Sequence, residues 1–508
     1  MKNHYWIILI MTSQSIYNFL FSRYTLFTFS LFLILVSMSA WLSLSEYGLK
    51  INDKIYQIDA FFKTPHTFLR YITFSFGFFL MIFSFSLPLK KERIANSFMI
   101  VIATYFIPLF FLLNLITPDG LNLVSLILTI VSLVYIVFYK KIIILNFNEK
   151  LLILSFIVIF YFFMYSAVIH GSNLRELDNY ARFIFAIPIY LFLRDIKFNL
   201  SFIYSSINIS GILIGLFALY LYFTDSQDRI YGFTSTATIY GNISMLHFLF
   251  SFILMLNANK QSASLTLPLL GMIFSLIAVV LTVSRGPLLA VPFVFLFLLI
   301  NHKRLLFNVK YIILCLLIIT SSVYSSGMFN RIIDGYNDIK AQSMDNLTTS
   351  WKSSGSIIPR IIIWQGSLNM IKQEPYWGIG LDKFNENLVE QIKDKKISPI
   401  KLDPVNPSAG FNHAHNQYLD IYAKTGIYGL IFFLFTMLIY LKIFYANLTA
   451  KDNSLIFGLL GITTILSYFA FMLTHVVFAH QQSTLFMLYT LTIFASIISN
   501  RNNIKVSK

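Results

Sequence analysis

The sequence has little charge for its length, because only 12% of its 508 residues are charged while 57% are hydrophobic. Soluble domains carry roughly 25% charged residues, so a soluble chain of this composition would lack the polar surface that keeps it in solution. A lipid-exposed surface requires this low charge, since a charged side chain in hydrocarbon costs several kcal/mol. The scarcity of charge therefore excludes an ordinary soluble protein and predicts a membrane protein.

Cysteine and acidic residues are also scarce. Cys315 is the only cysteine, which excludes an internal disulfide and a cysteine-rich metal site. Lysine and arginine number 38 against 22 acidic residues, which gives a net charge of +16. In a soluble protein this excess would indicate a nucleic-acid partner, but basic cytoplasmic loops account for it in a membrane protein. We therefore expect no nucleic-acid partner.

Hydrophobic runs fill most of the chain. A spanning helix needs about 20 apolar residues, so the runs predict an all-α transmembrane bundle of roughly twelve to fourteen spans. The candidate spans are residues 24–46, 68–88, 97–117, 119–138, 150–170, 180–194, 202–224, 239–256, 264–283, 286–301, 310–326, 427–446, 455–475 and 483–499. The run 180–194 is short, which predicts a broken or tilted segment. Residues 5–22 are interrupted by polar side chains, so we expect a cytoplasmic or interfacial lead-in to the first span, or an additional span, rather than a cleavable signal peptide.

Basic residues concentrate in alternate connections between the spans. The basic connections contain Lys90, Lys91 and Arg93, Lys140 and Lys141, Arg194 and Lys197, Lys260, His302 to Arg304, and Lys442 and Lys451. The other connections carry most of the acids, namely Asp53, Asp59, Glu176, Asp178, Asp225 and Asp228. The positive-inside rule places the basic set in the cytoplasm. With an even number of spans, both termini are also expected to be cytoplasmic.

One long connection divides the chain into an N-terminal bundle (1–326), a large loop (327–413) and C-terminal helices (414–508). The loop carries nearly equal numbers of basic and acidic residues. Long loops cross regardless of charge, and by span count this one lies outside. Within it, Pro359 suits the first turn of a helix that runs to about Gln373. A second helix is expected from about Asp382 to Lys395, after a turn.

Two arginines on the predicted outer side could bind phosphate. Arg285 lies in a four-residue hairpin between two spans. It could reach lipid headgroups instead, but the tight hairpin would hold the guanidinium at the mouth of the bundle. Arg360 and Trp364 are four residues apart and share one face of the predicted loop helix, which could alternatively lie on the membrane surface. A guanidinium is always charged, and its fork of N–H donors suits a phosphate.

The segment after the loop opens a helix just before a span. His415 is expected in the first turn, where backbone N–H groups favour an anion, and Gly426 is expected to end the helix. A neutral imidazole there can accept a proton, although it could simply cap the helix. Two arginines and a histidine facing one compartment could catalyse glycosyl transfer from a lipid diphosphate. The arginines would stabilise the leaving group, and the histidine would activate the acceptor hydroxyl.

At these residues the chain resembles the bacterial O-antigen ligase and O-antigen polymerase superfamily. The ligase pattern is His-[Asn/Ser/Gln], nine residues, Gly, two residues, then Gly, Thr or Tyr. It matches at His415, Asn416, Gly426 and Gly429. Further elements similar to the family are Ser284-Arg285-Gly286, and Arg360 and Trp364 followed by Pro375, Gly378 and Gly380. Arg229 to Gly232 is similar to one more element but lacks the usual Pro-Asn after the glycine.

The resemblance implies an inverting, metal-independent glycosyltransferase of the bacterial inner membrane, with no cofactor and with its active site facing the periplasm. Its partners would be membrane lipids, a glycan donor linked to undecaprenyl diphosphate, and a lipid A–core acceptor. The absence of an Asp-x-Asp motif at an outer span end is consistent with metal independence. Carried over by position, the catalytic residues would be His415 as base with Arg285 and Arg360 at the diphosphate, and the substrate-binding residues would be Arg229, Trp364, Asn416 and His413.

Three other functions compete with the ligase. An O-antigen polymerase uses the same type of donor but adds the glycan to another lipid-linked repeat, and a third member type adds glycan to protein serine. The histidine pattern favours the ligase. A transporter should carry polar groups near the middle of the bilayer. Only Asn242 and His247, within one predicted span, suit that function.

Overall fold

The structure is a computed structural model that describes residues 50–51, 54–55, 105–139, 144–196, 199–224, 229–258, 265–301, 333, 357–400, 411–450 and 452–506. The predicted spans 24–46, 68–88 and 310–326 lie outside these ranges, as do Cys315 and much of the loop 327–413. The chain divides into two compact units, Met1–Met99 and Ile100–Lys508. In the first unit, the described residues form a short antiparallel pair of strands, β1 (Lys50–Ile51) and β2 (Lys54–Ile55).

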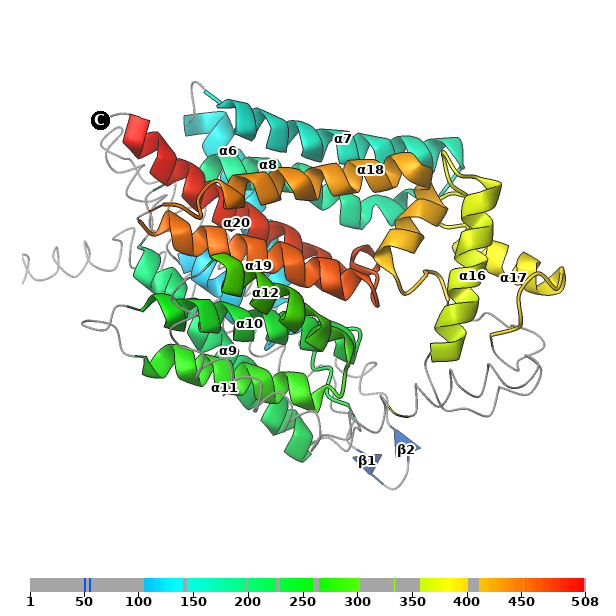
Figure 1. The fold of residues 1–508 in the computed structure, drawn as a ribbon, viewed down its shortest axis with the longest axis horizontal. Coiled ribbons are helices and arrows are strands. Elements are labelled where there is room, and N and C mark those ends of the chain that lie inside the picture. Colours follow the sequence, from blue (N-terminus) through cyan, green and yellow to red (C-terminus); the bar gives the residue numbers. More distant parts are fainter. Residues whose placement is uncertain are drawn as a thin grey trace, which may run out of the picture. The chain divides into compact units, whose positions relative to one another are not determined.

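The described part of the second unit is helical, with turns and short connections between the helices, which confirms the predicted all-α bundle (Figure 1). Its α-helices are α6 (Gly120–Tyr139), α7 (Phe147–Ile169), α8 (Asp178–Leu193), α9 (Leu200–Thr224), α10 (Ala237–Asn257), α11 (Thr266–Leu281), α12 (Ala290–Asn301), α16 (Ile357–Gln373), α17 (Phe384–Lys393), α18 (Gln417–Tyr445), α19 (Ser454–Met472) and α20 (Gln481–Val506). The 3-10 helices are η1 (Leu174–Leu177), η2 (Gly286–Leu289) and η4 (Val477–Ala479).

Six of these helices are long and apolar enough to cross a membrane: α7, α9, α10, α18, α19 and α20 as far as Asn500. Three shorter apolar helices accompany them, at Gly120–Ile136, Thr266–Leu281 and Gly286–Asn301. Each of these nine helices coincides with a hydrophobic run that the sequence predicted as a span. The chain is therefore a multi-pass membrane protein.

Helix α10 lies at the centre of the bundle. It packs against α9, α11, α19 and α20, and 89% of its most apolar stretch is buried, against 44% for α7 and for α18. A helix that is hydrophobic all round must be buried on all sides or face lipid. Protein therefore surrounds α10, whereas α7 and α18 turn a large part of their surface outward.

Helix α8 corrects one prediction. It runs without a break from Asp178 to Leu193, which contradicts the broken form of the segment predicted after Arg182 and leaves the tilted form as a prediction. The Arg182 side chain is only 9% exposed. Its guanidinium donates to the carbonyl of Asp178 at 3.0 Å and to the side chain of Asn179. These local acceptors let an arginine lie inside the helix without interrupting it.

A buried ion pair marks one end of the bundle. Nη1 of Arg194, at the end of α8, lies 2.7 Å from a carboxylate oxygen of Glu149, and both side chains are at most 4% exposed. Nη2 of Arg194 donates to the carbonyl of Ile144 at 2.8 Å, and Asn500 donates to the carbonyl of Ile196 at 2.6 Å. These contacts join the connections that the sequence predicted on one side of the membrane.

Helices α16 and α17 lie at the other end of the bundle, where α16 crosses the direction of the long helices (Figure 1). Apolar side chains of the two helices and of the adjoining segments form a small core around Ile363, Met370, Phe384 and Leu388. The helix bounds confirm the prediction based on Pro359 and Pro375. A hydrogen bond of 2.9 Å from the Asn173 N–H to Asp382 joins this part to the connection between α7 and α8.

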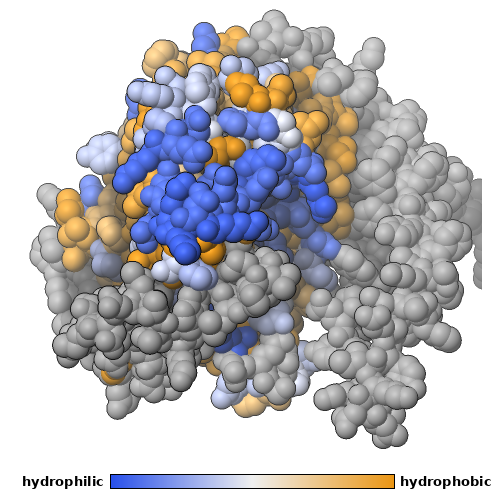
Figure 2. Space-filling view, turned by 90° about the vertical axis from the view of Figure 1, so that its right-hand side faces the viewer, coloured by the Kyte–Doolittle hydropathy of each residue, from blue (hydrophilic) through white to orange (hydrophobic). Residues whose placement is uncertain are grey.

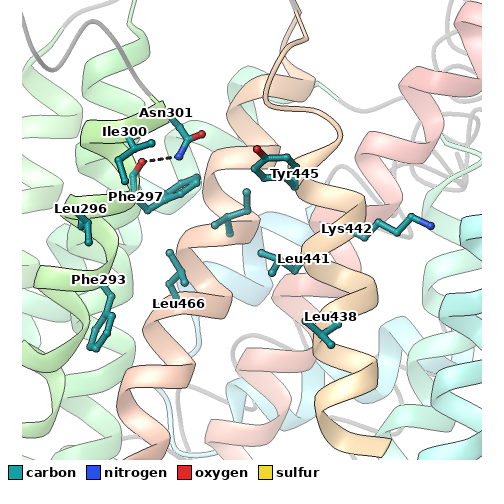
Figure 3. Close-up of a pocket in the computed structure, with 11 residues that line it drawn as sticks. Phe293, Leu296, Phe297, Ile300, Asn301, Leu438, Leu441, Lys442, Tyr445 and Leu466 are labelled. Atoms are coloured by element: carbon teal, nitrogen blue, oxygen red, sulfur yellow. Dashed lines mark hydrogen bonds between the residues drawn. The ribbon is translucent and has the colours of Figure 1, made fainter. Parts of the chain in front are cut away.

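A groove of about 580 Å³ lies between α12, α18 and α19 (Figure 3). Its walls include Phe293, Leu296, Leu438 and Leu466. Lys442 points away from it in the figure, with its amine 5.5 Å from the centre of the Phe147 ring. The groove is therefore an apolar feature of the membrane-spanning part, and it lies toward the end of the bundle away from α16.

Candidate active site

A turn directly in front of α18 is held by side chains from two directions. The N–H of Ala414 donates to Oδ1 of Asp420 at 3.0 Å, and its carbonyl accepts from Nε1 of Trp364 at 2.9 Å. The N–H of His415 donates to Nδ1 of His413 at 3.4 Å. His415 has a φ of 51°, a left-handed conformation that few non-glycine residues adopt. These hydrogen bonds stabilise a conformation that costs roughly 1 kcal/mol or more.

His415 lies outside the helix, which corrects its predicted place in the first turn. Asn416 is the N-cap of α18, and its Oδ1 accepts from the N–H groups of Tyr418 and Leu419 at 3.0 and 3.1 Å. The helix starts later than predicted because asparagine is a strongly preferred N-cap residue. Nδ2 of Asn416 donates to the carbonyl of Leu473 at 3.1 Å. This contact fixes the turn against the end of α19.

Asp420 supports the turn and was not identified from the sequence. Its side chain is 3% exposed, and Oδ2 lies 3.2 Å from Nζ of Lys424, one turn along α18. The Lys424 amine also lies 5.5 Å from the centre of the Phe384 ring in α17. The carboxylate thus accepts from the turn with one oxygen and pairs with a cation through the other.

Gly378 and Gly426 allow the backbone of the segment between α16 and α17 to approach the backbone of α18. A Cβ atom at Gly426 would lie 2.0 Å from the carbonyl oxygen of Tyr376, and one at Gly378 would lie 2.4 Å from the backbone of α18. The N–H of Ile427 donates to the carbonyl of Pro375 at 2.9 Å. These glycines therefore serve a close backbone contact that locks α16 and α17 onto α18.

Gly426 was also predicted to end the helix. Its φ of 68° and ψ of −172° are not helical, so the helix that starts after Asn416 ends here and a second helical part of α18 runs on to Tyr445. The prediction of a helix end is therefore confirmed, and the residue forms the kink between the two helical parts of α18. Helical residues on both sides of the kink belong to one long element that leads from the turn into the membrane-spanning part.

Arg285 stands at the start of η2, in the predicted hairpin after α11. Arg229 reaches the same hairpin, where Nε donates to the carbonyl of Thr282 at 3.1 Å and Nη2 donates to Oγ of Ser284 at 2.7 Å. A Cβ atom at the next residue, Gly286, would lie 3.1 Å from Oγ1 of Thr474. The hairpin therefore lies against the connection between α19 and α20, close to the turn in front of α18.

Arg360 links this hairpin to the turn. Burial lowers the pKa of its guanidinium, and the positive charge of Arg285 lowers it further. The two guanidinium groups are thus close enough to repel each other. Trp364, one helical turn along α16, donates to the turn itself. Arg285, Arg360 and His415, which the sequence predicted as catalytic residues, therefore come together from three separate elements.

Four histidines gather beside these arginines. The ring centres of His413 and His415 are 4.4 Å apart, and those of His413 and His480 are 5.9 Å apart. His475 and His480 stack with their centres 4.7 Å apart and an angle of 11° between the planes. Among the described residues, no group of three or more His, Cys, Asp or Glu side chains is placed to hold a metal ion.

The surroundings keep these imidazoles neutral. Burial, the neighbouring His413 and the charge of Arg360 lower the pKa of His415 to about 3. Burial and Lys424 are the main causes that lower the pKa of His413 to about 3. Burial lowers the pKa of His480 to about 4. At neutral pH these three rings are therefore uncharged, and the cations beside them attract an anion.

The end of the molecule that carries this cluster is hydrophilic. Figure 2 views this end, and hydrophilic residues gather at its centre over α16 and α17. The exposed charged residues of this part include Lys372, Glu374, Glu386 and Lys393. A polar surface therefore covers the cluster on the side away from the membrane-spanning helices.

Contacts within the bundle account for His247, one of the two polar groups that suited a transporter. His247 is fully buried in α10, where Nε2 lies 2.9 Å from Nδ2 of Asn114 and 3.4 Å from Oγ of Ser210. Its Nδ1 lies 3.3 Å from the carbonyl of Ile207. Both ring nitrogens have partners from neighbouring helices, so helix packing accounts for this histidine.

The sequence model of the O-antigen ligase family matches residues 270–434. The chain contains an O-antigen ligase domain. The match includes Arg285, Arg360, Trp364 and the turn with His415, and it ends before His475 and His480. The similarity to the O-antigen ligase family therefore covers the residues that the sequence predicted as catalytic.

An uncharacterized protein of Haemophilus influenzae is similar to this chain. It is 28% identical over 386 residues, which make up 75% of this chain and 94% of that protein. The similarity therefore extends well beyond the O-antigen ligase domain and into the other helices of the bundle.

Sequence reasoning missed His475, His480, Asp420 and Lys424. The spacing of Asp420 and Lys424, four residues apart on a helix, could have indicated an ion pair. The two histidines stand in a short connection between α19 and α20 with no recognisable pattern. Only the packing of α19 and α20 against α18 and α10 brings them to the site.

Proposed function

We propose that this protein is an O-antigen ligase, which transfers a glycan from undecaprenyl diphosphate to a lipid A–core acceptor at the periplasmic face of the bacterial inner membrane. The observation that carries the proposal is the convergence of Arg285, Arg360 and the His413–His415 turn at one end of the bundle. A cationic cluster with a neutral imidazole matches the needs of this reaction. The site then faces the periplasm, and both termini lie in the cytoplasm.

The proposed mechanism is a direct displacement. The acceptor hydroxyl oxygen forms a bond to the anomeric carbon of the donor while the bond from that carbon to the diphosphate breaks. His415 takes the hydroxyl proton, and the electron pair of the broken bond leaves with undecaprenyl diphosphate. Arg285 and Arg360 stabilise the charge that develops on this leaving group. A single displacement inverts the anomeric centre, and the residues named here perform it without a metal ion.

The remaining predicted residues position this machinery. Trp364 and His413 hold the turn through the hydrogen bonds to Ala414 and His415. Asn416 fastens the turn to the end of α19. Arg229 holds the hairpin that carries Arg285. We propose that these four residues set the distance between the diphosphate and the base.

Substitution tests the proposed site. Arg285→Ala and His415→Ala should each abolish transfer of lipid-linked glycan to lipid A–core, while the protein still inserts in the membrane. Arg175→Ala is the matched control, because Arg175 is an exposed arginine at the same end of the bundle. If both site variants retain the wild-type rate, the assigned site is wrong.

Deletion of the gene separates the ligase from a polymerase. Loss of all polymer on lipid A–core, with lipid-linked polymer accumulating, is the expected result for a ligase. Cores that carry a single repeat would instead identify a polymerase. For the orientation, a cysteine at Lys396 in a Cys315→Ser background should react with a membrane-impermeant thiol reagent added from the periplasmic side. Labelling only after permeabilisation would place the site in the cytoplasm.

A further inference from the structure

The connection between α19 and α20 is fastened to the proposed site on several sides. Asn416 donates to the carbonyl of Leu473 at 3.1 Å. The N–H of Phe478 donates to Oε1 of Gln417 at 2.9 Å, and its carbonyl accepts from Nδ2 of Asn179 at 2.7 Å. This connection therefore has a fixed position relative to the turn that carries the proposed base.

Two histidines project from this connection into the cationic cluster. Nδ1 of His480 lies 2.9 Å from Oγ of Ser235, and the His480 ring contacts the ring of His413. His475 stacks against the other side of His480 and is 4% exposed. His480 is more exposed than His475, so it presents the accessible ring of the pair.

The hydrogen bonding of His475 differs from that of a histidine that serves only to pack the bundle. His247 is such a histidine in the same chain, because both of its nitrogens have partners within the bundle. Among the described residues, Nε2 of His475 has no hydrogen-bond partner although it is buried. Burying such a group without a partner costs about 1–3 kcal/mol. A stacked phenylalanine would avoid this cost, so stability alone does not explain two histidines here.

The position of His475 and His480 indicates a role in binding the diphosphate. The connection that carries them touches the Arg285 hairpin, where Gly286 faces Thr474. The charge of Arg360 is among the causes that lower the pKa of His475, after burial and the neighbouring histidines. The pair therefore lies beside both arginines that the proposed function assigns to the leaving group. An uncharged imidazole in such surroundings can still donate one hydrogen bond through its N–H.

We propose that His480 is a further substrate-contacting residue, whose Nε2–H donates a hydrogen bond to a diphosphate oxygen of the lipid-linked donor. Ser235 donates to Nδ1 and thereby keeps the proton on Nε2. His475 holds the plane of the ring by stacking. This inference rests on the proposed function, since it places the diphosphate between Arg285 and Arg360. No bond is made or broken at His480, and its contribution grows as charge develops on the leaving group.

The test compares variants that keep or remove the donor. His480→Phe preserves a stacking ring but has no N–H, whereas His480→Gln keeps an N–H donor. A hydrogen bond to a charged group implies that His480→Phe weakens binding of farnesyl diphosphate, used as a short lipid-diphosphate probe, roughly tenfold. His480→Gln should stay within about threefold of wild type, because its amide can replace the donor.

Controls separate the possible failures. His170→Phe changes another histidine at the same end of the bundle, whose Nδ1 bonds the carbonyl of Ser166, and it should not affect binding. In the transfer assay, His480→Phe should raise the donor KM and lower kcat while the acceptor KM stays constant. Equal binding by His480→Phe and wild type, or equal loss in His480→Phe and His480→Gln, would overturn the role of His480. A wild-type protein that binds no farnesyl diphosphate would instead contradict the proposed function.

Discussion

Gly426→Ala tests the backbone contact between α18 and the segment before α17. The added Cβ would lie 2.0 Å from the carbonyl oxygen of Tyr376 and 2.5 Å from the backbone nitrogen of Trp377. Both contacts involve backbone atoms, so a change of side-chain rotamer cannot relieve them. The substitution therefore forces the segment around Tyr376 away from α18.

The expected magnitude follows from two contributions. The φ of 68° and ψ of −172° lie in a region that is essentially restricted to glycine, which costs about 1–3 kcal/mol for alanine. Separation of the segments also breaks the hydrogen bonds from Ile427 to Pro375, from Ile379 to Ala423 and from Gly380 to Lys424. At about 1 kcal/mol each, these add roughly 3 kcal/mol. The total destabilisation of this contact is about 4–6 kcal/mol.

Gly171→Ala is the matched control for backbone strain. Gly171 also has a positive φ, of 59°, but a Cβ there would meet nothing within 4 Å. It should therefore cost only the strain, about 1 kcal/mol. Thermal unfolding in detergent, followed by size-exclusion chromatography, measures both variants, and the transfer assay measures activity. Gly426→Ala should lose most of its activity and Gly171→Ala should keep it. Equal effects of the two substitutions would refute the role of the close contact.

Three further predictions concern the turn that carries the proposed base. Burial, His413 and Arg360 hold the pKa of His415 at about 3, so kcat/KM of the wild-type protein should not fall with decreasing pH until below about pH 5. Arg360→Gln removes a positive charge and raises this pKa, so the fall in kcat/KM should begin at a higher pH. Trp364→Phe leaves the Ala414 carbonyl without its donor, so kcat should fall while binding of farnesyl diphosphate is unchanged; weaker binding would contradict a positioning role. The folded protein keeps the clustered histidines neutral while the unfolded chain protonates them near pH 6.5, so the unfolding temperature should fall between pH 7 and pH 5; a constant value would argue against their burial.

Hydropathy predicted the helices because a spanning segment must satisfy its backbone internally and present apolar side chains to lipid. The bounds of α16 were also readable, since Pro359 fits a first helical turn and Pro375 cannot continue a helix. Motif spacing identified Arg285, Arg360 and His415. The sequence predicted that these three residues come together, but their proximity depends on how separate elements pack and could not be derived from motif spacing.

The parts that were missed depend on contacts between distant segments. His480 lies next to Ser235, far away in the sequence, and no local pattern indicates that pairing. The start of α18 was misplaced because Asn416, rather than the histidine before it, satisfies the first N–H groups of the helix. Gly426 was correctly interpreted as a helix end, but the close contact of its backbone with the segment around Tyr376 was not predicted.

The fastening of the turn to Leu473 and Phe478 has a consequence for biosynthesis. The His415 turn is translated before the segment that anchors it, and that segment stands between the last two helices. The nascent chain therefore lacks the contacts that fix the turn until the segment after α19 has been synthesised. Until then, nothing holds the proposed base in position, so a chain that ends before this segment is expected to lack the proposed activity.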